Sequence, residues 1–410
     1  MTTVGHIFHL SGHLKAVVVL FFCLLPTCRS TPEPAPEANT NVITPTPTPE
    51  RVVVKLPVTL PVLDALLFEE SFAEEVKTKV GLIDDEIAKL RTASSEAVMA
   101  LGRGKRRPGS TSLAVRRAEE KIRSILGDDK ADVLFEVVRN RFALGDLDAE
   151  TALPTQPNNI PDDTRIVVNS PAYRMDVFQD GVLLKTYRIG IGYPEFPIPN
   201  TIRKAQSIIF NPTWTPPDEP WVRGKLRPGV KVEAGSPDNP LGPIKIPIGM
   251  PSLIHGGKQP WKLGTFASHG CVGLTNKQVQ DFSLLLAQVS GTNLTPTDLK
   301  NLERKKTETR SVSLEQPVPV ELRYETIVVE NGKLMIYRDV YDQGTNTVDS
   351  LRKVLAVYDV SFDALSEKDR LRMLAAFRSV NTRGLGKIEI ALPELAGKGY
   401  PAPVNLNTGK

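Results

Sequence analysis

The stretch IHGGKQPWKLGTFASHGCVGLTN, residues 254–276, holds three reactive side chains: His255, His269 and Cys271. A cysteine attacks carbonyl groups as its thiolate, and a nearby imidazole is a common means of forming a thiolate at neutral pH. Gly256 and Gly270 stand beside these candidates. Glycine permits positive φ and lets a substrate approach backbone N–H groups that can stabilise an oxyanion. The pattern therefore predicts an active-site loop.

The chain has three cysteines: Cys23, Cys28 and Cys271. Because the first two lie in an N-terminal apolar segment, no pair is left for a disulfide in the folded body. A lone cysteine is either a small buried hydrophobe or a reactive thiol. The histidine and the glycines around Cys271 favour the reactive thiol.

The order of these residues resembles the signature of the L,D-transpeptidase catalytic domain, the YkuD-like family. The matching residues are His255-Gly256, then Ser268-His269-Gly270-Cys271-Val272, and finally Asn276. Papain-like enzymes place the cysteine far before its histidine, whereas here the histidine comes first and lies close in sequence. Residues 163–191, 211–217 and 238–242 are also similar to parts of that domain. The resemblance implies a mostly-β, sandwich-like catalytic domain.

The resemblance also implies a role for each residue. Cys271 would be the nucleophile, with its backbone N–H as an oxyanion donor. His255 would be the general base that holds the thiolate, although a structural histidine is the alternative. His269 would either transfer protons or orient the loop. Three further residues would shape the substrate and oxyanion site: Ser268, Gly270 and Gly256.

The implied reaction is acyl transfer on peptidoglycan. The enzyme would take a tetrapeptide stem as donor, release D-Ala and form a 3→3 cross-link with a second stem. Water as acceptor would make it an L,D-carboxypeptidase, and a lipoprotein lysine would make it a wall-attachment enzyme. The resemblance requires no metal or organic cofactor.

Two positions differ from the pattern or leave a choice open. Many members of the family have arginine or asparagine where this chain has Gly273, so a substrate carboxylate would bind elsewhere, for example at Lys258 or Lys262. Trp261 is either a lid over the substrate or a packed aromatic residue.

Two rival readings use the same residues. A zinc site made from His255, His269 and Cys271 would need a further ligand or water. The remaining histidines of the chain all lie near its N-terminus: His6, His9 and His13. The other rival is a non-catalytic module that binds the cell wall, and the intact motif argues against it.

Composition and patterning divide the chain into segments. A short apolar run at 16–25 after Lys15 fits a signal peptide or lipoprotein leader over residues 1–29, with Cys28 as a candidate lipid-anchor site and ordinary cleavage or an uncleaved anchor as alternatives. A Pro/Thr-rich spacer, predicted to be disordered, covers 30–50. We expect an α-helical module at 51–150, a catalytic domain at 163–343 and a C-terminal helical tail at 344–410. The expected fold class is thus α+β, and the protein would be exported to the periplasm or cell wall.

Periodicity predicts the elements within these segments. Apolar residues at helical spacing predict helices at 60–80, 83–101, 112–126 and 130–144, with Gly81, Gly102 and Gly127 just after helix ends. Strand patterns predict strands at 165–169, 173–179 and 182–191, with Asp180-Gly181 as a hairpin turn. We expect a helix at 276–288, strands at 318–329 and 334–341 joined by Asn331-Gly332, and two helices after residue 348. Beyond residue 381 we expect a loose Gly/Pro-rich end.

Net charge argues against a nucleic-acid partner. The formal charge is +4 over 410 residues, and the basic run at 103–107 is interpreted as a solvated loop between helices, with a binding patch as the alternative. The expected partners are peptidoglycan stems and, through Cys28, a membrane.

Overall fold

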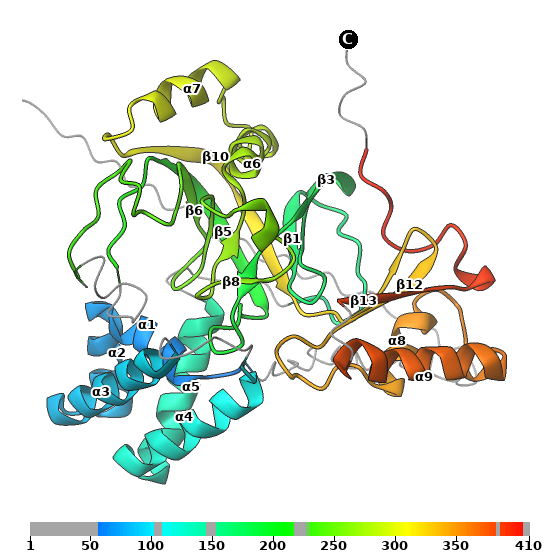
Figure 1. Cartoon of the computed structure of the whole chain (residues 1–410), viewed down its shortest axis with the longest axis horizontal. Helices are drawn as coiled ribbons and strands as arrows, with labels where there is room; N and C mark the ends of the chain where they lie inside the picture. Colours follow the sequence, from blue (N-terminus) through cyan, green and yellow to red (C-terminus); the bar gives the residue numbers. More distant parts are fainter. Residues whose placement is uncertain are drawn as a thin grey trace, which may run out of the picture. The chain divides into compact units, whose positions relative to one another are not determined.

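The fold is described from a computed structural model of the chain (Figure 1). It covers residues 56–101, 109–144, 153–216, 227, 229–382 and 386–404. The expected leader and spacer, Gly102 and the basic loop at 103–107 lie outside the described residues. No helix among the described residues combines the length and the apolar character needed to cross a bilayer.

The first part of the described chain is helical, as expected. Its helices are α1 (Leu60–Leu67), α2 (Glu70–Val80), α3 (Asp84–Leu101), α4 (Thr111–Leu126) and α5 (Asp128–Leu144). They share one apolar core that includes Leu63, Leu90 and Leu134. Gly81 ends α2 at φ +72°, which confirms the glycine predicted after that helix.

The prediction of a single helix over 60–80 is wrong. Glu69 adopts an extended conformation, so α1 ends and α2 starts as a separate helix. The carboxylate of Glu69 lies 3.2 Å from Arg141 Nη2 of α5. This break lets Phe72 and Val76 of α2 join the shared core, a tertiary preference that local periodicity does not contain.

The central part contains a curled sheet of eight strands in the order β3-β2-β1-β10-β5-β6-β7-β9, among the described residues. Their bounds are β1 (Arg165–Asn169), β2 (Arg174–Gln179), β3 (Val182–Arg188), β5 (Thr201–Phe210), β6 (Ile244–Pro247), β7 (Leu253–His255), β9 (Val272–Gly273) and β10 (Arg310–Arg323). Strands β4 (Ile191–Gly192) and β8 (Phe266–Ser268) pair separately. The hairpin at Asp180-Gly181 is confirmed, with both residues at positive φ.

Two helices follow the last strand of the motif: α6 (Asn276–Val289) and α7 (Pro296–Arg304). The predicted helix after the cysteine is therefore confirmed. Thr275 and Gln278 form a capping box at its start. Val279, Phe282 and Leu286 are fully buried in the core of the curled sheet, so α6 fixes the chain that leaves Cys271.

The C-terminal part has its own sheet and core. The sheet has the strand order β11 (Ile327–Glu330), β12 (Lys333–Tyr337), β13 (Lys387–Ala391). Together with helices α8 (Val348–Ala356) and α9 (Glu367–Thr382), it encloses an apolar cluster. Short 3₁₀ turns η2 (Phe362–Ala364) and η3 (Pro393–Leu395) join it, and η1 (Pro260–Lys262) lies near the cysteine loop. The two predicted helices after 348 and the Asn331-Gly332 turn are confirmed.

Two expectations about this region are wrong. The strand predicted over 318–329 is two strands, because the chain leaves the curled sheet after Arg323 and enters the second sheet at Ile327. Residues 387–391, expected to be loose, form β13 because Ile388 and Ile390 join the apolar cluster. The boundary proposed near residue 343 remains a prediction, and we note that β12 before it pairs with β13 after it.

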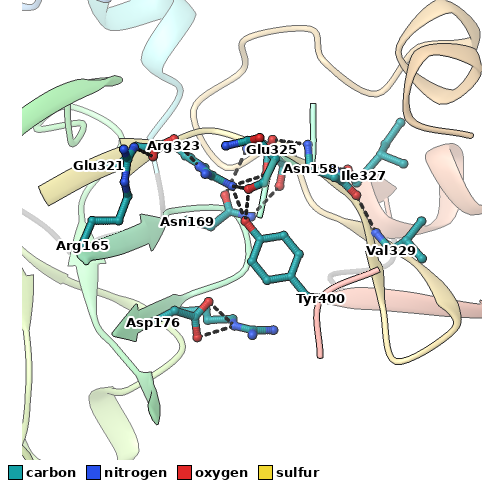
Figure 2. A network of polar contacts seen from close by, with 12 residues as sticks. Asn158, Arg165, Asn169, Asp176, Glu321, Arg323, Glu325, Ile327, Val329 and Tyr400 are labelled. Atoms are coloured by element: carbon teal, nitrogen blue, oxygen red, sulfur yellow. Dashed lines mark hydrogen bonds and ion pairs between the residues drawn. The ribbon is translucent and has the colours of Figure 1, made fainter. Parts of the chain in front are cut away.

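A buried polar network lies where β10 gives way to β11 (Figure 2). Arg323 donates from Nε to Glu321, and from Nη1 to Tyr400 Oη and to the Asn159 carbonyl, the last at 2.6 Å. Glu321 is fully buried and also accepts from Arg165 Nη1 at 2.7 Å. The network therefore joins β1 to β10 through ion pairs, and β10 to Tyr400 through a hydrogen bond.

We expect Arg323→Met to destabilise the protein by about 3–5 kcal/mol, because it breaks the buried ion pair with Glu321 and leaves that carboxylate with Arg165 alone. The melting temperature should fall by at least about 6 °C. Thermal unfolding followed by circular dichroism measures this. Lys387→Met is the matched control, since Lys387 pairs with Glu389 on the exposed side of β13 at 2.9 Å and should leave the melting temperature unchanged. Equal melting temperatures for both variants would contradict the assignment.

Candidate active site

Strand pairing gathers the predicted site residues at one edge of the curled sheet. β7 runs between β6 and β9, and the register pairs Lys245 with His255 and His255 with Gly273. Residues that are paired across neighbouring strands direct their side chains to the same face of the sheet. Cys271 directly precedes β9, so alternation along the strand puts it on the face of Gly273.

Cys271 is the one cysteine among the described residues, and it is partly exposed. It follows Gly270, whose φ of +96° makes a turn that favours glycine. Burial raises the pKa of the Cys271 thiol, while the Leu253 N–H and the charges of Lys258 and Lys245 act in the opposite direction. The thiolate therefore depends on nearby donors and cations.

Ser268 holds the backbone of the nucleophile. Its hydroxyl donates to the Cys271 carbonyl at 2.5 Å and accepts from the Cys271 N–H at 3.1 Å. The Cys271 N–H, which we predicted to be an oxyanion donor, is thus already hydrogen-bonded to Ser268 in this conformation. The N–H of Gly270 donates to no acceptor among the described residues, which makes it the better candidate donor. Ser252 fixes this turn by donating to the Gly270 carbonyl at 2.9 Å.

His255 is buried, with 3% of its surface exposed. Its Nδ1 lies 2.7 Å from the Gly256 carbonyl oxygen, and since a carbonyl only accepts, Nδ1 carries the hydrogen and Nε2 is the basic nitrogen. Burial, together with the charges of Lys258 and Lys245, lowers the pKa of His255 to about 3, although the carbonyls of Gly256 and Leu241 act in the opposite direction. The imidazole is therefore neutral at neutral pH, and its Nε2 can accept a proton.

Gly256 and Gly257 position this histidine rather than extend the site. The Gly256 N–H donates to the Ile244 carbonyl at 3.2 Å, so the geometry favours a positioning role over that of an oxyanion donor. A Cβ at Gly256 would lie 2.9 Å from Val279 Cγ1, so the turn packs directly on α6. Asn276 accepts from the Gly257 N–H at 2.7 Å, which assigns the asparagine of the motif to this turn.

His269 is half-buried between two aromatic rings. Its ring centroid lies 4.7 Å from that of Phe196, edge to face, and 5.6 Å from that of Tyr193. Aromatic contacts of this kind fix a ring orientation. Of the two roles that the sequence left open for His269, these contacts favour orienting the loop over transferring protons.

The helical module contacts the loop that carries these two rings. Thr59 Oγ1 donates to the Glu195 carbonyl at 2.6 Å, and Thr111 Oγ1 donates to the Pro194 carbonyl at 2.7 Å. Both threonines are buried. Within the loop, the Tyr193 N–H donates to the Ser268 carbonyl at 3.0 Å. The module therefore supports the segment that packs on His269.

We expect Thr111→Val to cost roughly 1–3 kcal/mol of stability, because it leaves a buried carbonyl without its donor. The amide of Tyr193 should also exchange faster, since its loop loses a hydrogen bond. Chemical denaturation and hydrogen–deuterium exchange measure both effects. Thr78→Val is the matched control, because exposed Thr78 donates only within α2, to the Glu74 carbonyl. Unchanged exchange at Tyr193 in the Thr111 variant would show that the module does not support the loop.

Sequence reasoning missed one residue of the site and left the roles of three others open. Lys245 was missed; its signal is a lysine in the apolar run IKIPI, where only one face is buried in the core. Lys258 lies beside Cys271 and acts electrostatically on it, whereas Lys262 acts on Lys258. Trp261 is 70% exposed and lies under Lys262 Nζ at 4.6 Å, so it is not a packed core residue.

No group of three or more His, Cys, Asp or Glu side chains in the described part of the chain could hold a metal ion.

Comparison with known proteins finds a family model and several similar proteins. The family model for the L,D-transpeptidase catalytic domain, YkuD, matches residues 163–293. The protein named "Probable L,D-transpeptidase YbiS" of Escherichia coli (strain K12) is 36% identical over 122 residues, which are 28% of this chain and 39% of that protein. "Probable L,D-transpeptidase ErfK/SrfK" of the same strain is 34% identical over 129 residues, 30% of this chain and 41% of that protein. The chain thus spans about two fifths of the length of these relatives.

Two solved structures are also similar. The catalytic domain of the Enterococcus faecium L,D-transpeptidase is 17% identical, with a TM-score of 0.25 over 40% of this chain and 99% of that one. An L,D-transpeptidase from Mycobacterium smegmatis is 17% identical, with a TM-score of 0.23 over 39% of this chain and 58% of that one.

The family match includes His255, Cys271 and the strands from β1 to β9, whereas β10 of the same sheet lies beyond it. Residues 163–293 are thus a catalytic domain of the L,D-transpeptidase YkuD family.

Proposed function

We propose that this protein is a peptidoglycan L,D-transpeptidase that forms 3→3 cross-links. The observation that carries the proposal is the placement of a partly exposed Cys271 on the sheet face of a buried, neutral His255. The family membership of residues 163–293 supports a stem peptide as the substrate.

The reaction has two steps. Cys271 Sγ attacks the carbonyl carbon of the third stem residue, and its thiol proton passes to His255 Nε2. The bond to D-Ala breaks, its nitrogen takes that proton, and a thioester remains. An amine of a second stem then attacks the thioester, the new amide bond forms, His255 takes the amine proton and Sγ leaves as thiolate.

Other residues hold this machinery in place. Ser268 fixes the Cys271 backbone, Gly256 fixes the His255 tautomer, and Gly270 offers an N–H for the oxyanion. His269 orients the loop. The chemistry needs no cofactor, and we place the protein outside the cytoplasm, with Cys28 as a possible membrane anchor through a lipid.

Mass spectrometry of products tests the proposal. The full chain is incubated with a disaccharide–tetrapeptide, and we expect a dimer that lacks one D-Ala and is joined between third residues. A disaccharide–tripeptide, which has no D-Ala to release, is the matched control and should not act as donor. Loss of D-Ala without dimer would indicate an L,D-carboxypeptidase, and transfer to an added lipoprotein lysine would indicate wall attachment. No change at all would favour a non-catalytic wall-binding module.

A further inference from the structure

The side chain of Lys258 lies across Gly273, two residues after the nucleophile. A Cβ built on Gly273 would lie 2.7 Å from Lys258 Cε and 2.8 Å from its Cγ. The Lys258 N–H donates to the Leu274 carbonyl at 3.0 Å, which fixes the start of the side chain. The φ of Gly273 is not among the positive ones, so what glycine provides here is space for the Lys258 side chain. Gly273 therefore accommodates the aliphatic part of Lys258.

A second lysine reaches the same face from another strand. Lys245 of β6 pairs with His255 of β7, which pairs with Gly273 of β9. The next residues along these three strands, Ile246, Ile254 and Val272, also pair with one another. Their side chains are fully buried in the apolar core on the opposite face of the sheet. Lys245, His255 and the Lys258 side chain therefore surround Cys271 on one face.

This cluster contains cations without a carboxylate partner. Among the described residues, no ion pair includes Lys245 or Lys258. Burial lowers the pKa of both lysines, and the one group that raises it in each case is Cys271. Lys262 lowers the pKa of Lys258 further. The other ionisable groups near Cys271 are His255, which is neutral, and His269, which packs on Tyr193 and Phe196.

We propose that Lys258, assisted by Lys245, stabilises the thiolate of Cys271 as it forms, by placing positive charge beside its sulfur. When the S–H bond breaks, its electron pair stays on Sγ and its proton passes to water or to His255. Both ammonium groups keep their protons throughout. The inference rests on the proposed role of Cys271 as nucleophile, and it does not depend on which acceptor the enzyme uses.

Alkylation kinetics test this inference without any peptidoglycan substrate. The rate at which iodoacetamide modifies Cys271 in the full chain is measured against pH, and the Cys271 peptide is followed by mass spectrometry so that Cys23 and Cys28 do not contribute. Removing one cation near a thiolate raises the thiol pKa by about one unit or more. Lys258→Met should therefore slow alkylation at neutral pH by about tenfold, while the rate at high pH stays close to that of wild type.

Three further variants separate charge from structure. Lys258→Arg should restore most of the neutral-pH rate, because it keeps the charge. Gly273→Ala should act like Lys258→Met, since its Cβ displaces the lysine stem. Lys277→Met, on the exposed surface of α6, is the matched control and should match wild type.

The inference is overturned if the Lys258→Met profile superimposes on that of wild type, or if its rate falls equally at every pH. If Lys258→Met does not fold, the Gly273→Ala profile decides in the same way. A normal alkylation profile in a protein that makes no cross-link would contradict the proposed function alone. Cross-linking with an unchanged Lys258→Met profile would contradict the lysine role alone.

Discussion

Cys271→Ala is expected to abolish cross-linking, with a rate at least on the order of 10⁴-fold below wild type. No other described residue supplies a thiol, and the variant removes the atom on which the thioester would form. The fold should survive, because Ser268 contacts only the backbone of residue 271. The mutant should therefore melt at nearly the same temperature as wild type.

The loss of the covalent intermediate can be measured directly. Wild-type protein treated with a carbapenem, a reagent that acylates active-site cysteines, should gain the mass of one adduct on the Cys271 peptide, and Cys271→Ala should gain none there. Lys277→Met should be labelled like wild type. Adducts or cross-links that persist in Cys271→Ala would assign the acyl transfer to another residue.

The sequence predicted those parts of the site that lie close together along the chain. His255, Ser268, Gly270 and Cys271 form a local motif, and their spacing already indicated a cysteine nucleophile with a nearby base. The helix α6 and the Asp180-Gly181 hairpin were likewise encoded by apolar spacing and turn residues. Local chemistry was sufficient in each case.

The missed features depend on pairing between distant segments. Lys245 reaches the site only because β6 pairs with β7 in one register, and no local pattern contains that register. The hydrogen bond from the Thr111 hydroxyl to the Pro194 carbonyl joins residues that are 83 positions apart in the sequence. The change of sheet after Arg323 also depends on partners far away, namely Arg165 and Tyr400. Periodicity found the strands there and could not assign them to sheets.

His255→Asn is expected to lower the rate of cross-linking by about 10²–10⁴-fold, the usual contribution of a positioned general base. Asparagine keeps a polar side chain of similar size near the Gly256 carbonyl but cannot accept and return a proton. Steady-state kinetics with the tetrapeptide donor measure the loss. Alkylation of Cys271 at high pH should change little, because an ionised thiol needs no base. A variant that keeps the wild-type rate would remove His255 from the mechanism.

The same substitution should change how stability depends on pH. Burial lowers the pKa of His255 to about 3, below the value of 6.5 for an unperturbed histidine. In the unfolded chain His255 is therefore protonated below about pH 6.5, whereas in the native state it is protonated only below about pH 3. The stability contributed by the buried neutral ring is present above pH 6.5 and is lost as pH falls, by up to about 5 kcal/mol. Calorimetry at about pH 7 and pH 4 should thus show a larger fall in melting temperature for wild type than for His255→Asn. Equal falls would mean that the pKa of His255 is not lowered in the native state.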